Sequence, residues 1–328
     1  MAAEETTLEE ITLKTDKLVD FLQEVEDWRN RWEVVGEHAV YRGHTDFNWI
    51  LIAKLFRDPD AKPVNRTSDA PEEIEKQLLS EHLPVDEAQS LERRLFDDFS
   101  RYLYAYRPDL VCTVHEEQES CSNTRAMQEW RQLAIAQHYG LPTRFLDFTT
   151  NVLVALFFAV EEPAARRKTT EGKWQEQGSA VWCIEVPNRR KVWEVWKDKG
   201  ADVWLSPREF AEERSDPPIA NFVDTAFIPE HIDERIRAQG SVFMTEPRGK
   251  GSDWTLHVKL QDKTKTVLNR ETGEEKNTRT LKVRIPTEFR ESLREQLDLV
   301  GINPATLFPD LGSAARYLAW AVHQRKRP

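Results

Sequence analysis

Cysteine is rare in this chain, and no hydrophobic run is long. The 328 residues include Cys112, Cys121 and Cys183, an odd number without C-x-x-C spacing. We therefore expect reduced thiols and a cytoplasmic protein, rather than a disulfide framework or a cysteine metal site. No apolar run approaches the roughly 18 residues of a membrane-spanning helix. Because the first residues are acidic, we expect neither a secretory signal nor a membrane partner.

The usual signatures of metal and dinucleotide sites are also missing. The eight histidines are scattered, without H-E-x-x-H or H-x-x-E-H spacing, so no metal is expected. No G-x-G-x-x-G run follows a predicted strand, which disfavours a Rossmann dehydrogenase. The formal net charge of −11 argues against a broad nucleic-acid-binding surface, because such surfaces neutralise phosphates with Lys and Arg. A local basic cleft remains open.

The rest of the composition is that of a folded protein, with 39% hydrophobic and 10% aromatic residues. A chain of this length can form one large domain or two. Apolar spacing predicts a mixed α/β fold, with helices over residues 18–28, 91–103, 130–138, 152–160, 289–297 and 311–322. It predicts strands over residues 40–42, 145–148, 180–186, 241–244, 254–260, 263–268 and 281–285, with 269–276 as a turn. Residues 57–89 are read as a surface excursion with a short helix near 74–79, and 191–219 are left unassigned.

Two runs of residues say most about function: Tyr41-Arg42-Gly43-His44, and the stretch from Ala134 to Thr150. In the second run, Gly140 is expected to end a helix as its C′ residue, just before Pro142. A short strand and a polar helix start follow within ten residues. So many element ends within a short run are typical of an ordered site rather than of a connecting loop.

Both runs resemble the FRG-domain family, which is named for a Phe/Tyr-Arg-Gly signature. The family's Leu-Asp-Trp-Thr run stands here as Leu146-Asp147-Phe148-Thr149. The resemblance continues with an apolar helix over 151–160, an Arg-x-x-x-Gln-Gly-x-x-Phe run from Arg235 to Phe243, and Gly301 to Pro309. It implies an N-terminal helical segment, 1–35, and an FRG-type α/β domain, 36–328. Within that domain we expect core motifs in 40–186, a third motif in 232–246, and C-terminal strands and helices in 254–328.

The order of these motifs is similar to that of ADP-ribosyltransferases. In those enzymes an Arg or His on a first strand, a Ser/Thr strand-to-helix junction and a Glu or Gln at a third strand jointly hold NAD. The similarity implies a split, mixed sheet with surrounding helices and a C-terminal β-hairpin and helix region, and it implies NAD as substrate. The implied catalytic residues are Arg42, Thr149, Gln239 and Glu246. The implied NAD-binding residues are Tyr41, Arg42, Gly43, His138, Thr149, Thr150 and Asn151.

The implied activity is transfer of ADP-ribose to a macromolecule, as in a bacterial toxin or an anti-phage defence effector. The acceptor, protein or nucleic acid, is left open, and an antitoxin or regulatory protein is a further expected partner. The alternative is a non-catalytic regulatory domain that holds a nucleotide or a partner in the same cleft. The two hypotheses differ in whether NAD turns over.

For several candidate residues, both a functional and a purely structural role are physically reasonable. The planar guanidinium of Arg42 suits phosphate or ribose oxygens, or it is simply an exposed arginine at a strand end. Residues 149–151 offer free N–H groups to an anion, or they form an N-cap. Asp147 is expected to be buried and paired with Arg144 or Arg42, because an unpaired buried carboxylate is costly.

The remaining polar candidates are weaker as catalysts. Gln137 and His138 precede the Gly-Pro turn, and bonding to loop carbonyls is the preferred reading for them. Gln239 is favoured over Glu246 as the third-strand residue, because it lies directly before the strand that starts at Ser241. As a neutral amide it could orient a ribose but could not deprotonate an acceptor.

Overall fold

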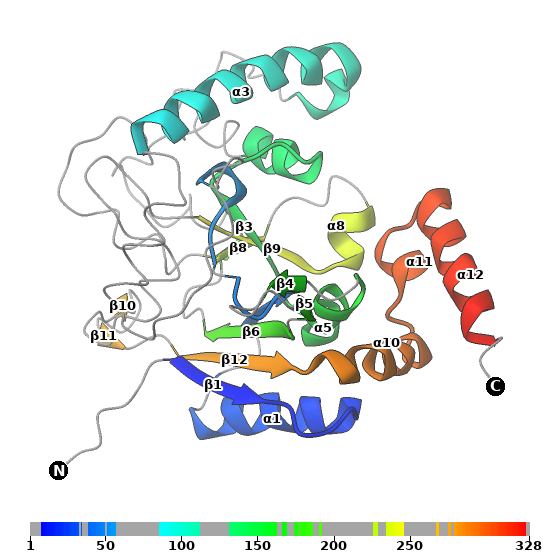
Figure 1. Cartoon of the computed structure of the whole chain (residues 1–328). Helices are drawn as coiled ribbons and strands as arrows, with labels where there is room; N and C mark the ends of the chain where they lie inside the picture. Colours follow the sequence, from blue (N-terminus) through cyan, green and yellow to red (C-terminus); the bar gives the residue numbers. More distant parts are fainter. Residues whose placement is uncertain are drawn as a thin grey trace.

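One mixed β-sheet flanked by helices organises the protein, as a computed structural model shows (Figure 1). The predicted mixed α/β class is confirmed. The structure describes residues 8–32, 34, 39–49, 51–56, 85–111, 131–162, 166–168, 174–176, 178–185, 190–191, 226–228, 234–245, 267–268, 275–276 and 279–325.

The sheet has eight strands in the order β1-β12-β6-β2-β3-β9-β8-β7. Their bounds are β1 Leu8–Thr12, β2 Ala39–His44, β3 Phe145–Thr149, β6 Ser179–Glu185, β7 Arg190–Lys191, β8 Ala226–Ile228, β9 Ser241–Thr245 and β12 Thr280–Ile285. The outermost pairs, β1 with β12 and β7 with β8, are parallel, and the other neighbours are antiparallel. Two small antiparallel pairs lie outside this sheet: β4 Arg166–Lys168 with β5 Trp174–Glu176, and β10 Val267–Leu268 with β11 Glu275–Lys276.

The sheet is covered on both faces, which explains the apolar character of β6. Every residue of β6 is buried, and residues 180–184 are all apolar, as expected for a strand covered on both faces. Val181 and Cys183 belong to the core cluster that packs against helices. Trp182 and Ile184 point to the opposite face, where they pack with residues 51–55.

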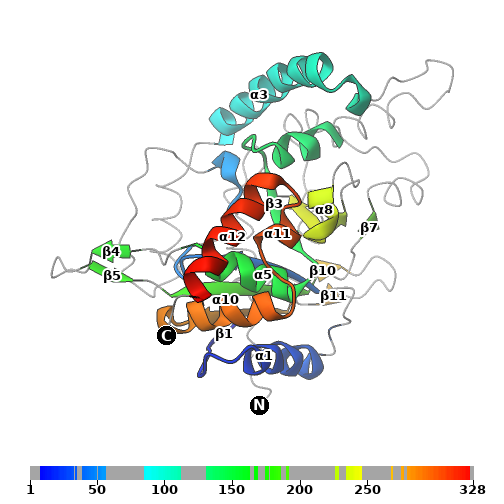
Figure 2. The same cartoon turned by 90° about the vertical axis from the view of Figure 1, so that its right-hand side faces the viewer.

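The helices are α1 Leu18–Arg31, α3 Val85–Tyr106, α5 Val152–Val160, α8 Glu234–Ala238, α10 Arg290–Leu299, α11 Pro304–Leu307 and α12 Leu311–Arg325, and residues 131–138 are also helical. Short 3-10 turns are η2 Lys54–Phe56, η3 Pro108–Leu110 and η5 Thr287–Phe289. Helices α1, α5 and α10 share one hydrophobic core with β2, β6 and β12. Figure 2 shows α5, α10, α11 and α12 gathered on one side of the sheet, with α3 at the far end.

Two helices end at a glycine with positive φ, and the sequence predicted this role for Gly140. Gly140 has φ 92°, and its N–H donates to the Gln137 carbonyl while the Leu141 N–H donates to Ala136. Gly301, with φ 80°, closes α10 by the same pair of bonds. This is the Schellman arrangement, in which a left-handed residue satisfies the last helical carbonyls.

Other predictions need correction or lie outside the described residues. Strand β1 was not predicted, nor were β4, β5, β7 and β8. Glu275 and Lys276 were predicted as part of a turn, but they form β11. The predicted helix near 74–79 and the predicted strand 254–260 fall outside the described residues, as does Glu246.

Candidate functional site

The candidate site lies where the sheet opens between β2 and β3. Strand β2 pairs with β6 along its whole length, whereas its described pairing with β3 consists of Tyr41 opposite Thr149. A pocket of about 700 Å³ is found at this fork. Its lining comes from all parts of the chain: Tyr41, Arg42, Gly43, His44, Thr45, Trp49, Gln137, His138, Asp147, Phe148, Thr149, Ala155, Phe158, Glu161, Glu162, Arg235, Ile236, Gln239, Ser241, Phe243, Arg294, Pro304, Phe308 and Arg316.

Arg42 bridges the two strands at the fork. Its Nε donates to His44 Nε2 at 3.0 Å, and its Nη1 donates to the Asp147 carbonyl of β3. Its guanidinium carbon lies 6.0 Å from the centre of the Phe148 ring. Because β2 and β3 have no further ladder bonds beyond the Tyr41 pair among the described residues, the Arg42 side chain takes their place. The structure therefore holds a cation in a fixed position at the pocket.

Gly43 has a packing role that the sequence did not reveal. A Cβ atom there would lie 2.0 Å from the Ala155 carbonyl oxygen and 2.7 Å from the Ala159 nitrogen. Both atoms belong to the backbone of α5, which crosses β2 at this point. The glycine of the Tyr-Arg-Gly run thus allows close helix–strand contact, and it does so from a position that also lines the pocket.

The third motif is fastened directly to the strand-to-helix junction. Thr149 Oγ1 donates to the Gln239 carbonyl at 2.6 Å and accepts from the Asn151 N–H at 3.0 Å. The Thr150 N–H donates to the Gly240 carbonyl at 3.0 Å. Gly240 has φ 56°, and a Cβ there would lie 2.8 Å from Thr150 Oγ1. The Gln-Gly pair therefore brings two distant sequence runs into register.

The polar start of α5 acts as a helix cap. Asn151 is the N-cap, and its Oδ1 accepts from the Leu153 N–H at 3.0 Å. Its carbonyl accepts from Val154 and Ala155. Thr150 and Asn151 do not occur in the described pocket lining, whereas Thr149 does. The N-cap reading of this junction describes its geometry well.

The prediction that Asp147 is buried in an ion pair was wrong. Asp147 is exposed, and its Oδ2 accepts from Gln137 Nε2 at 3.0 Å. Gln137 Oε1 in turn accepts from Thr143 Oγ1 at 2.5 Å. Gln137 thus bonds two side chains rather than loop carbonyls. The result is a carboxylate oriented into the pocket by a side-chain relay.

Arg144 pairs elsewhere. It forms a buried salt bridge with Glu92 of α3, with Nε 3.0 Å from Oε1 and 2.9 Å from Oε2. Both side chains are less than a tenth exposed. This pair ties α3 to the start of β3, and it leaves the Asp147 carboxylate facing solvent.

The C-terminal segment forms the opposite wall. Gln239 Nε2 donates to the Leu307 carbonyl at 3.1 Å, and the Arg235 guanidinium stacks 4.7 Å from the Phe308 ring centre. Phe308 also meets Phe158 of α5 edge to face, with ring centroids 6.0 Å apart. The third motif therefore holds the end of α11 against the pocket.

Sequence reasoning missed several charged lining residues. Glu161 follows α5 directly, Arg294 lies on α10 and Arg316 on α12. Burial raises the pKa of Glu161, and the nearby Glu162 adds to that, although Arg294 and Arg316 oppose it. Burial lowers the pKa of Arg294, against the opposing effect of nearby carboxylates. No motif in the sequence includes Glu161, Arg294 or Arg316, so no sequence signal singled them out.

Two further groups are chemically quiet. Burial raises the pKa of Tyr41 to about 12, so its hydroxyl stays protonated near neutral pH. Cys183 is a fully buried thiol whose pKa is raised by the same cause, so it is packed as core. Among the described residues, no cluster of three His, Cys, Asp or Glu side chains could hold a metal ion.

Comparison with known families finds a match that lies almost entirely in the N-terminal half of the chain. Residues 37–168 match the family model of the FRG domain. This stretch of the chain, which is less than half of its length, is similar to an FRG domain. No curated protein and no solved structure matches the chain significantly.

The FRG match covers β2, α3, β3 and α5, which supply the fork of the site. Arg235, Gln239 and Phe308 lie beyond the matched range, yet they line the same pocket. Glu246 lies outside the described residues, so its position relative to the FRG domain is not part of this geometry. Among the described helices, none is long and apolar enough to cross a bilayer.

Proposed function

We propose that the pocket binds NAD and that the protein is an ADP-ribosyltransferase. One observation carries this proposal: four runs far apart in sequence converge on one pocket at the opening of the sheet. They contribute Arg42, Thr149, Gln239 and Phe308. An arginine, a hydroxyl junction and a glutamine at one cleft match the motif order of NAD-consuming transferases. A volume of about 700 Å³ is also typical of sites that enclose a whole cofactor-sized ligand.

In the proposed reaction, the N-glycosidic bond between nicotinamide and its ribose breaks, and nicotinamide leaves with the bonding electron pair. The anomeric carbon becomes cationic, and a lone pair of the acceptor forms the new bond. The proton of the acceptor passes to a base, which the neutral Gln239 cannot be. Within the described lining, the carboxylates near at hand are Asp147, Glu161 and Glu162.

Arg42 and Gln239 would act mainly by position. Arg42 is held in place by His44 and by the Asp147 carbonyl, so its guanidinium is already oriented to donate hydrogen bonds to oxygens of the bound ligand. The Gln239 amide N–H already holds the Leu307 carbonyl. We therefore assign the side-chain oxygen of Gln239, Oε1, to accept a hydrogen bond from the ribose 2′-hydroxyl.

A second candidate is a non-catalytic domain that binds a nucleotide or a regulatory partner in this pocket. It is favoured by the local bonding of two implied catalytic groups. The Thr149 hydroxyl is engaged by Gln239 and Asn151, and the Gln239 amide by Leu307. These bonds serve the fold whether or not NAD turns over.

Labelled NAD separates the two candidates. Incubation of the pure protein with labelled NAD and separate protein, RNA and DNA fractions should label one fraction, which also names the acceptor class. Absence of label in all three would support the binding domain instead. A role as a toxin or anti-phage effector in the cytoplasm, restrained by an antitoxin, belongs to the same proposal and predicts toxicity on expression.

Gln239→Ala tests the assigned role of the amide. We expect transfer of label to be abolished while NAD affinity changes by less than about tenfold, because the interaction matters mainly in the transition state. Gln296→Ala is a matched control. It also removes side-chain hydrogen bonds to backbone carbonyls, those of Asp16 and Ser292, but Gln296 does not occur in the described pocket lining. Normal transfer in Gln239→Ala would remove the residue from the mechanism.

A further inference from the structure

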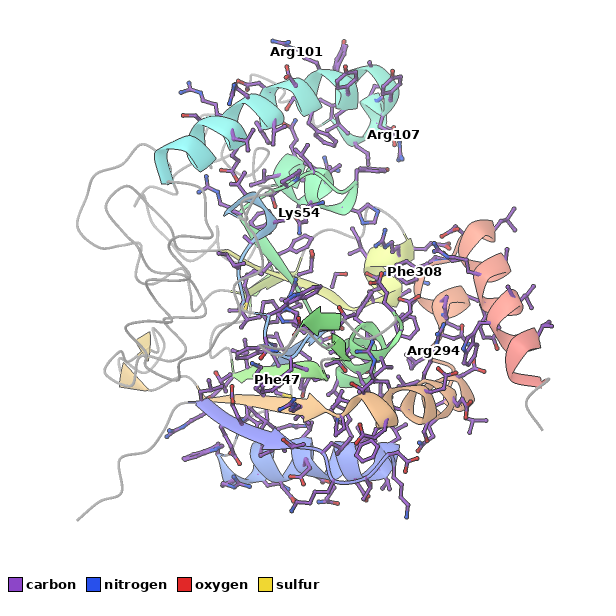
Figure 3. All side chains as sticks on the ribbon, in the orientation of Figure 1. Phe47, Lys54, Arg101, Arg107, Arg294 and Phe308 are labelled. Carbon is purple, nitrogen blue, oxygen red and sulfur yellow. The ribbon has the colours of Figure 1, made fainter. Side chains whose placement is uncertain are left out.

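Three arginines stand together on the C-terminal wall of the pocket. Arg235 comes from α8, Arg294 from α10 and Arg316 from α12, and we call this set the arginine wall. Figure 3 shows Arg294 and Phe308 on this side of the molecule. No sequence motif includes Arg294 or Arg316, and Arg235 opens the Arg-x-x-x-Gln-Gly-x-x-Phe run.

Each arginine of the wall is positioned without a carboxylate salt bridge in the described part of the chain. Arg235 stacks on Phe308 at 4.7 Å, and Arg294 stacks on Trp320 at 4.6 Å. Arg316 donates to the Ser313 hydroxyl at 3.0 Å. A guanidinium stacked on a ring presents its N–H edges sideways, the orientation that binds phosphate oxygens in pairs.

The charge of the pocket also favours an anionic ligand. Its described lining contains four arginines against three carboxylates, whereas the whole chain has a net charge of −11. Glu161 lies close enough to Arg294 and Arg316 to feel both charges. It offsets part of their repulsion when no ligand is bound, and the pocket remains positive in an acidic protein.

The sequence pointed to a different phosphate site, the N-terminus of α5. That end is already capped by Asn151, whose side chain accepts from the Leu153 N–H. Asn151 and Thr150 also do not occur in the described pocket lining. The start of α5 is therefore poorly suited to bind a phosphate within this pocket.

We propose that the arginine wall is a binding subsite for the phosphate groups of the nucleotide ligand. If the pocket takes NAD as proposed above, the pyrophosphate lies against Arg294 and Arg316. The fork around Arg42 and Asp147 then receives the nicotinamide ribose. The inference deepens the proposed function, but phosphate binding can be measured without any catalysis.

Calorimetric titration of the full-length protein tests the subsite. The probes are ADP-ribose, inorganic pyrophosphate and the phosphate-free nucleoside adenosine. Arg294→Gln and Arg316→Gln should each weaken ADP-ribose and pyrophosphate at least about tenfold, as expected for loss of a charge-assisted contact, and leave adenosine unchanged. Arg316→Lys should recover part of the loss, because the charge returns without the planar fork.

Arg101→Gln on α3 is the matched control, since Arg101 is exposed and lies far from the wall in Figure 3. It should bind all probes like wild type. Arg316 is itself exposed, so its variant keeps the test valid if Arg294→Gln loses the fold. Unchanged pyrophosphate and ADP-ribose affinity in a folded Arg316→Gln protein would overturn the proposal, as would a wild type that binds neither probe.

The two proposals fail separately. Pyrophosphate binding that depends on Arg294 and Arg316, without label transfer from NAD, would keep the subsite and reject the transferase. Label transfer from NAD, combined with an ADP-ribose affinity that neither Arg294→Gln nor Arg316→Gln changes, would support the transferase and reject the subsite.

Discussion

At the scale of single residues, the site is set by which partner each charge finds. Asp147 lies three positions after Arg144 and was expected to pair with Arg144 or with Arg42. Arg144 instead pairs with Glu92, 52 residues earlier, and Asp147 is held by Gln137. The local sequence suggests pairs between residues that are close along the chain, whereas the Arg144–Glu92 pair forms only because folding brings α3 next to β3. Arg42 is similar, because its partner on β3 is a backbone carbonyl.

This exchange of partners predicts opposite effects of two substitutions. Glu92→Ala should lower the free energy of unfolding by about 3–5 kcal/mol, because it leaves the buried Arg144 charge without its carboxylate. Asp147→Ala should change it by about 0.5 kcal/mol or less, because Asp147 is exposed. Chemical denaturation of both variants checks this. Equal losses, or a larger loss for Asp147→Ala, would contradict the geometry.

At the scale of elements, helix α5 is the part that connects fold and site. It crosses β2 over Gly43, its cap follows Thr149, and its last turn leads to Glu161. Its uniformly apolar sequence predicted a buried helix, and six of its nine residues are buried. What the sequence did not show is how closely α5 approaches the strand. The close approach becomes evident only when a Cβ atom is placed on Gly43, because that atom would collide with the α5 backbone.

Gly43→Ala should therefore damage the fold. The added methyl group meets backbone atoms of α5, which cannot rotate away, so we expect a loss of about 3 kcal/mol in unfolding free energy. Gly312→Ala is the control, because its Cβ would only approach the Asp310 side chain, at 3.1 Å. Thermal unfolding compares the two. A Gly43→Ala protein as stable as Gly312→Ala would show that α5 and β2 are not packed this closely.

Glu161 gives α5 a pH-dependent effect on stability. Its pKa in the folded protein is raised above the ordinary value of 4.5 by burial, so the folded state disfavours the ionised form. The contribution of protonated Glu161 to the free energy of unfolding is therefore fully present below pH 4.5. It is lost as the pH rises through the raised pKa of Glu161 in the folded protein. Glu161→Gln keeps the neutral form at every pH.

The melting temperature of Glu161→Gln should thus match wild type in acid and exceed it increasingly as pH rises, until Glu161 is fully ionised. The exposed Glu26→Gln on α1 serves as the control and should show no such trend. A Glu161→Gln protein that is less stable than wild type at neutral pH would mean that attraction to Arg294 and Arg316 outweighs the burial of the carboxylate.

At the scale of the whole molecule, the elements were more predictable than their assembly. Helix α5 and strand β9 were predicted within a residue, because apolar spacing and glycine stops are local signals. Strand β1 was missed because LEEIT carries two acidic residues in five, and it becomes a strand only by pairing with β12. The sheet order joins β1 to β12 from opposite ends of the chain, and no local pattern encodes that.

The candidate site divides in the same way. Arg42, Thr149 and Gln239 were found from motifs, and the structure brings them to one pocket. Arg294 and Arg316 were not, because nothing in an amphipathic helix says which of its arginines faces a cavity. The FRG match ends at residue 168, so the C-terminal wall was also outside the reach of family comparison.

The central claim is that these converging motifs form an NAD site, and direct binding of NAD tests it. Calorimetric titration should give wild type a dissociation constant of about 1 mM or tighter, the usual range for enzyme substrates. Arg42→Gln, checked for a normal melting temperature, should bind at least about tenfold more weakly, because it removes guanidinium N–H groups that donate to ribose oxygens at the fork. Absence of NAD binding by wild type, or equal binding by folded Arg42→Gln, would contradict the account.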